Sequence, residues 1–133
     1  MMKYKKFIQA YNVLQKLSNM DFNVKDAFSI YNLQKSLEPV TKFGAERERA
    51  LIEKYKGVVG QDGSIKFWES DEDEEEKRIG TENMTAFIEE ICELNDMEMD
   101  QEITPITLSY DSLGDQKISP NDIMCLDGFV HFE

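Results

Sequence analysis

A run of six consecutive acidic residues, at positions 71–76, is the densest group of chemically active side chains in the sequence, and it follows the only tryptophan, Trp68. The run is either a solvated linker or a mimic of a row of phosphates that occupies a basic nucleic-acid groove on a target. Trp68 either covers an edge of the core or anchors an interface. If both features bind a partner, the candidate partner-binding residues are Trp68, Glu69, Asp71, Glu72, Asp73, Glu74, Glu75 and Glu76.

Groups able to catalyse a reaction or to hold a metal are sparse. His131 is the only histidine, and the sequence supplies no nucleophile or orienting acid beside it. Cys92 and Cys125 lie in apolar helical patterns outside any thiol-enzyme context, so we expect buried free thiols in a reducing cytosol. The acids at 71–76 and 98–102 lack the spacing of a calcium-binding EF-hand loop, and no phosphate-binding loop is present. We therefore expect no enzyme activity, no metal and no cofactor.

The charge of the chain is large and unevenly distributed. Its net charge is -12, which repels nucleic acid and anionic membrane surfaces. Residues 1–56 carry eleven basic and six acidic side chains, whereas residues 57–133 carry four and twenty-one. Such halves either dock against each other and partly neutralise, or mark an interaction surface. We predict a partner protein with a basic surface, and no direct binding to nucleic acid or to a membrane.

The elements that must position these groups begin with two helices. Apolar residues at spacings of three and four predict a helix over residues 3–18. Asn23, three residues before Asp26, is a candidate N-cap for a second helix. Pro39 predicts a kink or a break, after which a helical rhythm resumes as far as Gly57. The first two helices should form an antiparallel hairpin.

A β-hairpin, an acidic loop and a third helix are predicted next. Apolar residues on both sides of the Asp62-Gly63 turn signal predict the hairpin. The acids that follow cannot pack into a core, so residues 69–79 are predicted to form a solvated loop. An apolar helical face then resumes, and the third helix should begin at Thr81 or Thr85.

The end of the chain combines an interrupted strand with a short helix. Alternating apolar residues over 97–110 predict a strand whose phase switches at Pro105. Ser119 as N-cap, followed by a proline, predicts a short helix, and residues 129–132 either add an edge strand or simply pack. The 133 residues have the size of a single domain. Its expected class is α+β, with an N-terminal antiparallel helical hairpin, a small β-hairpin or sheet and two further short helices.

The most distinctive segments are residues 11–17 (YNVLQKL), residues 52–55 and 62–65 (IEKY and DGSI), and residues 118–126 (ISPNDIMCL). They resemble a family of short, uncharacterised phage and prophage proteins of low-GC Gram-positive bacteria. The resemblance covers most of the chain except residues 70–78, and it rests on helix stripes and caps rather than on catalytic motifs. It implies a phage origin and a place in the cytoplasm of an infected bacterial host.

Two roles fit this context. The chain either inhibits or modulates a host nucleic-acid-handling or defence protein by binding a basic surface, or it assists virion assembly as a tail or head factor or a minor structural component. The negative charge after residue 56 favours the first, anti-defence type of role, because it would steer association with a cationic groove in a salt-dependent way. The amphipathic helices could also bury their stripes across a dimer, so a homo-oligomer stays open.

Overall fold

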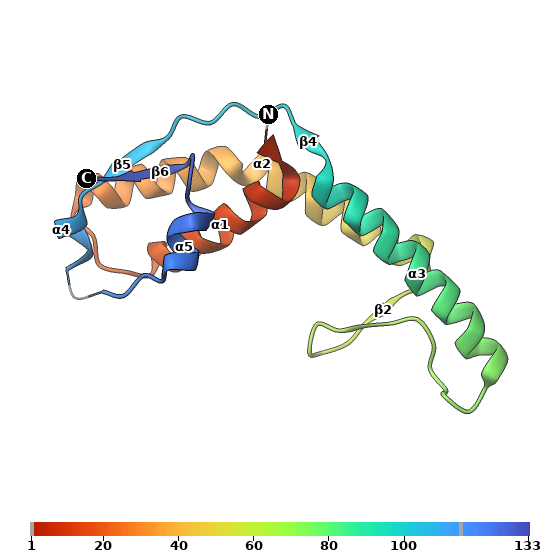
Figure 1. The fold of residues 1–133 in the computed structure, drawn as a ribbon. Helices are drawn as coiled ribbons and strands as arrows, with labels where there is room; N and C mark the ends of the chain where they lie inside the picture. The colour runs from red at the N-terminus through yellow and green to blue at the C-terminus, as the bar shows by residue number, and fades with distance from the viewer. Residues whose placement is uncertain (1, 115) are drawn as a thin grey trace. The chain divides into compact units, whose positions relative to one another are not determined.

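The computed structural model describes residues 2–114 and 116–133, and Figure 1 shows its helices and strands. The predicted α+β class is confirmed, since helices predominate and the strands of the described residues form three two-stranded sheets. The chain divides into two compact units. Unit 1 comprises Met1–Lys42 and Glu98–Glu133, and unit 2 comprises Phe43–Met97. The single domain expected from the chain length stays a prediction.

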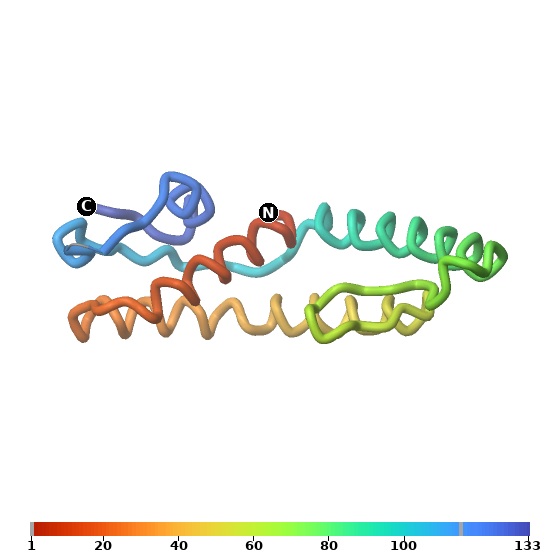
Figure 2. The backbone as a smooth tube through the Cα atoms, turned by 90° about the horizontal axis from the view of Figure 1, so that it is seen from below, coloured from red at the N-terminus to blue at the C-terminus, as the bar shows by residue number. Residues whose placement is uncertain are grey.

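Unit 1 is built on the predicted helical hairpin, formed by α1 (Tyr4–Ser18) and the first part of α2 (Val24–Lys54). Figure 2 shows these two segments side by side. Asn23 caps α2, because its Oδ1 accepts a hydrogen bond from the backbone N–H of Asp26 at 2.8 Å. The apolar stripes bury the side chains that hold the hairpin together, namely Phe7, Ala10, Leu14, Leu17, Ile30, Leu33 and Leu37.

Pro39 does not end α2, so the break that the sequence allowed is wrong. A proline inside a helix lacks the N–H for one helical hydrogen bond. On either side of it, however, Leu37 and Val40 are only 0% and 2% exposed. Burial of these side chains offsets the lost hydrogen bond, because most helical stability in proteins comes from packing of an apolar face.

Two short sheets complete the backbone of unit 1. β1 (Met2–Lys3) pairs antiparallel with β4 (Glu98–Met99). β5 (Ile106–Leu108) pairs parallel with β6 (Val130–Phe132). In place of one interrupted strand over 97–110, the chain has two short strands in different sheets, and residues 100–105 belong to neither. The end of the chain forms a strand rather than merely packing.

Two short helices lie between these strands. α4 (Tyr110–Leu113) was not predicted, whereas α5 (Pro120–Cys125) begins at the predicted N-cap, Ser119. The Ser119 hydroxyl accepts a hydrogen bond from the backbone N–H of Asp122 at 3.1 Å, and the reciprocal bond completes a capping box. The ammonium of Lys16 lies 2.8 Å from the Asp122 carboxylate and ties α5 to α1.

Unit 2 contains the second part of α2, a β-hairpin and a long third helix. β2 (Val58–Val59) pairs antiparallel with β3 (Ile65–Lys66), as the turn signal predicted. Gly63 in that turn has a φ of 83°, a conformation that favours glycine. α3 (Glu74–Asp96) then follows.

The acidic segment and the start of α3 differ from the prediction. α3 begins at Glu74, not at Thr81 or Thr85, so only the first part of the expected 69–79 loop lies outside the helix. Asp73 caps the helix by accepting a hydrogen bond from the backbone N–H of Glu76 at 3.1 Å. Acidic residues in the first turn also interact favourably with the positive end of the helix dipole. The run that cannot pack can therefore still begin a helix.

Candidate partner-binding surface

The strand β3 leads into the candidate site. There, α3 lies unusually close to the backbone of Phe67. A Cβ atom on Gly80 would lie only 2.5 Å from the Phe67 carbonyl oxygen and 2.8 Å from Cε3 of Trp68. The ring centroids of Phe67 and Phe87 are 5.4 Å apart. A glycine in α3 thus permits the contact that holds Phe67 and Trp68 in place.

The acidic segment, which we define as residues 69–76, is folded against its own neighbours. The indole N–H of Trp68 donates a hydrogen bond to Oδ1 of Asp71 at 2.7 Å. The backbone N–H of Glu69 donates to Oε1 of Glu76 at 2.9 Å. Together with the helix cap, these bonds hold residues 69–73 in a defined conformation that leads directly into the first turn of α3.

The predicted partner-binding acids divide by what their side chains do. Four have partners within the chain, namely Asp71, Asp73, Glu75 and Glu76. Within the described residues, three carboxylates make no hydrogen bond or ion pair, namely Glu69, Glu72 and Glu74. A row of equivalent, free charges is therefore not what this segment presents.

The structure distributes the predicted residues over two grooves. The first, the Trp68 groove, has a volume of about 260 Å³ and is lined by Ile65, Lys66, Phe67, Trp68, Glu69, Asp71 and Met84. The second has a volume of about 420 Å³, and Asp73, Glu75 and Glu76 line it beside Gly80. Glu72 and Glu74 line neither groove. Trp68, Glu69 and Asp71 are thus the predicted residues that share one concave, partly apolar site.

A second polar cluster in unit 2 was missed by the sequence analysis. The Tyr55 hydroxyl donates a hydrogen bond to Glu90 at 2.5 Å, and the ammonium of Lys54 lies 3.2 Å from the same carboxylate. Arg47 lies 3.7 Å from its other oxygen. The hydrogen bonds from Tyr55 and Lys54 hold the pKa of Glu90 below its usual value. No local pattern signals this cluster, because Glu90 meets the other residues only through tertiary packing.

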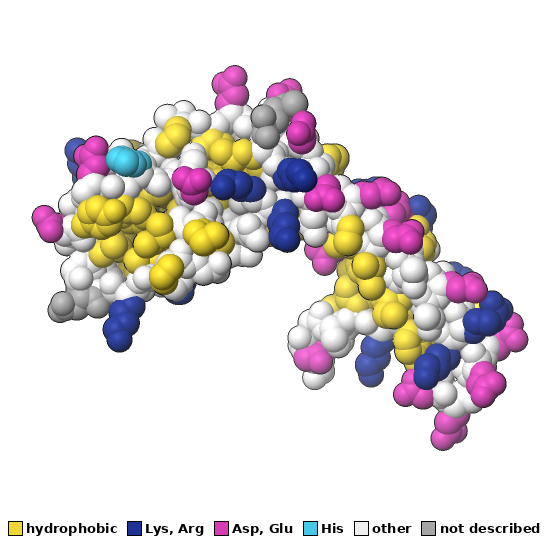
Figure 3. All heavy atoms as spheres, viewed as in Figure 1, with side chains coloured by type: hydrophobic (Ala, Val, Ile, Leu, Met, Phe, Trp, Pro, Cys, Tyr) yellow, Lys and Arg dark blue, Asp and Glu magenta, His cyan; other side chains and the backbone are white. Residues whose placement is uncertain are grey.

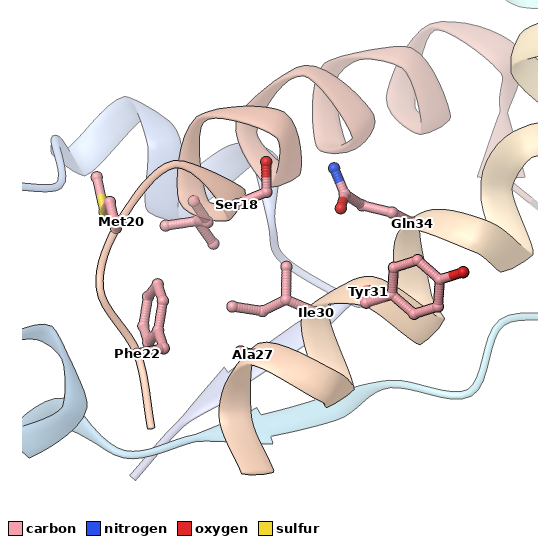
Figure 4. Close-up of a pocket in the computed structure, with 8 residues that line it drawn as sticks. Ser18, Met20, Phe22, Ala27, Ile30, Tyr31 and Gln34 are labelled. Atoms are coloured by element: carbon pink, nitrogen blue, oxygen red, sulfur yellow. The ribbon is translucent and has the colours of Figure 1, made fainter. Parts of the chain in front are cut away.

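Unit 1 has an apolar pocket of its own, shown in Figure 4, with a volume of about 210 Å³. It lies between the end of α1 and the start of α2 and is lined by Leu17, Ser18, Met20, Phe22, Ala27, Ile30, Tyr31 and Gln34. The polar side-chain groups in its lining belong to Ser18, Tyr31 and Gln34. Among the described residues, no carboxylate or histidine lines this pocket, which offers a small, largely apolar surface.

The remaining candidates for chemistry are dispersed. The side chain of His131 is 69% exposed, and its Nε2 lies 3.9 Å from Glu133. Cys92 is exposed and Cys125 half-buried, so the prediction of buried thiols is wrong, although both are free. Across residues 2–114 and 116–133, no three His, Cys, Asp or Glu side chains are placed to hold a metal ion. None of the helices in the described residues is long and apolar enough to cross a membrane.

Comparisons with protein-family models, with curated proteins and with solved structures find no match to this chain.

Proposed function

We propose that this chain is a non-catalytic binding protein that inhibits or modulates a nucleic-acid-handling or defence protein of an infected bacterial host. The observation that carries the proposal is the Trp68 groove, in which an aromatic wall meets the carboxylates of Glu69 and Asp71. Such a combination suits a partner that presents a cationic side chain next to an apolar one.

The charge of unit 2 supports a basic partner. Residues 43–97 contain sixteen acidic and seven basic side chains. A negative field of this kind attracts a cationic groove and raises the association rate, and it repels nucleic acid itself. The resemblance to phage proteins adds the setting in which a host enzyme would be the target.

The test is recovery of partners from infected host cells with the tagged chain. We expect a nucleic-acid-handling or defence protein that is released between about 0.1 and 1 M salt, because the Debye length falls from about 10 to 3 Å. Recovery of virion proteins alone would replace this function with a role in assembly. Recovery that is insensitive to salt would contradict an acidic interface.

A variant in which three carboxylates become neutral amides tests which surface binds the partner. The changes Glu69→Gln, Glu72→Gln and Glu74→Gln remove three carboxylates that have no partner within the described residues, so the fold should be preserved. The matched control, Asp100→Asn, Glu102→Gln and Asp127→Asn, changes the net charge equally at exposed positions of unit 1. We expect the first variant to lose the partner and the control to keep it. Equal loss from both would mean that overall charge, rather than this surface, governs binding.

A further inference from the structure

α3 carries two stripes at the same helical spacing. The inward stripe consists of buried or half-buried residues, namely Gly80, Asn83, Phe87, Glu90 and Leu94. One position further along the chain, a second stripe consists of Thr81, Met84, Ile88, Ile91 and Asn95. Both repeat at intervals of three and four, the pattern of a helix that packs against another helix. The second stripe is rotated by about 100° around the helix from the first.

The second stripe is uncharged on a strongly charged helix. Ile88 is 50% exposed, and Met84 and Ile91 are half-buried. Figure 3 shows a line of hydrophobic side chains between α3 and the β2–β3 hairpin. A partly exposed apolar row at helical spacing provides the seam that a partner helix needs.

A row of acidic side chains, which we call the acidic ridge, borders this stripe on its solvent side. Glu82, Glu89, Glu93 and Asp96 lie on the neighbouring face of α3, beyond Thr85 and Cys92. Glu82 pairs with Arg78 at 3.1 Å, and α3 has only one other basic residue, Lys77. A helix that docks on the stripe would therefore have acids along one flank for most of its length.

The stripe also continues into the Trp68 groove. Met84 belongs to the stripe and lines the groove together with Trp68 and Asp71. The distance from Thr81 to Asn95 along the helix axis is about 21 Å, which is close to four turns. A docked helix of similar length would place one terminal apolar side chain beside Trp68.

We propose that the partner binds unit 2 through a basic amphipathic helix of about four turns, laid along Met84, Ile88 and Ile91 with its cationic flank against the acidic ridge. This inference rests on the proposed function and names the element that the partner contributes. Charge decides against a second copy of the chain, because acids occur at both ends of α3 and two such ridges would repel each other in either orientation.

Two synthetic peptides of 15 residues test the proposal. Both carry leucines at helical spacing, and they differ in having either lysines or glutamates beside them. We expect the lysine peptide to bind the full chain and to slow alkylation of Cys92, which borders the stripe, but not of Cys125 in unit 1. Equal binding of the two peptides, or equal protection of the two thiols, would overturn the proposal.

A point variant separates this site from the rest of the surface. Ile88→Gln keeps a good helix former while removing the apolar side chain. It should lower the affinity for the lysine peptide by about tenfold or more. Ile123→Gln, at a similarly exposed isoleucine of α5, is the matched control and should bind as the unchanged chain does. Unchanged affinity of Ile88→Gln, with far-UV circular dichroism showing an intact fold, would overturn the proposal. A dimer in sedimentation equilibrium that Ile88→Gln dissociates would also overturn it.

The two proposals fail in different ways. If capture of the host protein depends on Glu69, Glu72 and Glu74 but not on Ile88, the proposed function stands and the helix-binding site falls. If the lysine peptide binds at Ile88 but no host nucleic-acid or defence protein is recovered, the helix-binding site stands and the proposed function falls.

Discussion

The two units of this chain are stabilised in different ways. Of the eighteen buried hydrophobic side chains among the described residues, fifteen lie in unit 1 and three in unit 2. Acidic and basic residues number eleven and eight in unit 1, but sixteen and seven in unit 2. Unit 1 therefore has a packed core and nearly balanced charge, whereas unit 2 has few buried apolar side chains and a large excess of acidic residues.

This difference indicates where stability and where binding reside. Burial of apolar area stabilises unit 1, because each large buried side chain contributes about 1.5–3 kcal/mol. Unit 2 depends on a few specific contacts, chiefly the close approach at Gly80 and the cluster around Glu90. Segments with few buried apolar contacts are the ones that open locally and that often bind partners.

The largest loss of stability is expected from a substitution in the core of unit 1. Phe7 is fully buried and meets Phe129 edge to face at 5.7 Å. Phe7→Ala should lower the free energy of unfolding by about 3–5 kcal/mol, because it removes this contact and leaves a cavity. Urea unfolding followed by circular dichroism measures the change. Phe28→Ala, at a side chain that is 63% exposed, is the control. A loss as large for Phe28→Ala would contradict the assignment of the core.

The next effect is expected in unit 2, at Gly80. Gly80→Ala gains about 1 kcal/mol of helix propensity but forces a methyl group against the Phe67 carbonyl. The carbonyl cannot yield as a flexible side chain would, so we expect a net loss of about 2 kcal/mol. The fluorescence of Trp68, the only tryptophan, reports the urea midpoint of this unit. Thr85→Ala should stay within about 0.5 kcal/mol. Stabilisation by Gly80→Ala would show that the close approach imposes no constraint.

Local sequence signals predicted those elements whose residues act on their immediate neighbours. The caps at Asn23 and Ser119 bond to residues three positions away, and the Asp62-Gly63 turn joins adjacent strands. The local signals failed where packing between residues far apart in the sequence determines the secondary structure. Pro39 lies within a helix because its flanks are buried, and α4 forms although its four residues contain no periodic pattern.

The candidate site was predicted in composition but not in arrangement. The acidic segment was recognised from its charge, and Trp68 from its type. That Asp71 bonds to the indole while Glu72 has no side-chain partner among the described residues depends on the course of the turn, which the sequence does not specify. The Glu90 cluster joins residues 35 positions apart, so no local pattern could reveal it.

A smaller effect is expected from the cap of α5. Ser119→Ala removes the hydroxyl that accepts from Asp122 and should cost about 1 kcal/mol. The loss should appear as a lower urea midpoint for unit 1, followed by hydrogen exchange of the α1 amides. Ser36→Ala, at an exposed position inside α2, removes a serine without removing a cap and should be neutral or slightly stabilising. If both variants lost equal stability, the loss could not be assigned to the capping box.

The smallest effect is expected from titration, and it compares the two units directly. The Tyr55 and Lys54 hydrogen bonds lower the pKa of Glu90 from 4.5, and the Lys16 hydrogen bond lowers the pKa of Asp122 from 3.8. Each carboxylate therefore stabilises its unit fully above that ordinary value, and the stabilisation is lost as the pH falls through the lower folded-state pKa.

Glu90→Gln should accordingly flatten the acid limb of the stability curve reported by Trp68, whereas Asp122→Asn should flatten the one reported by the α1 amides. Glu89→Gln removes the same charge from an exposed neighbour in α3, outside the cluster, and is the matched control. Were Glu90→Gln to flatten both curves equally, the two units would unfold as one cooperative structure. The contrast between a packed unit 1 and a locally opening unit 2 would then be lost.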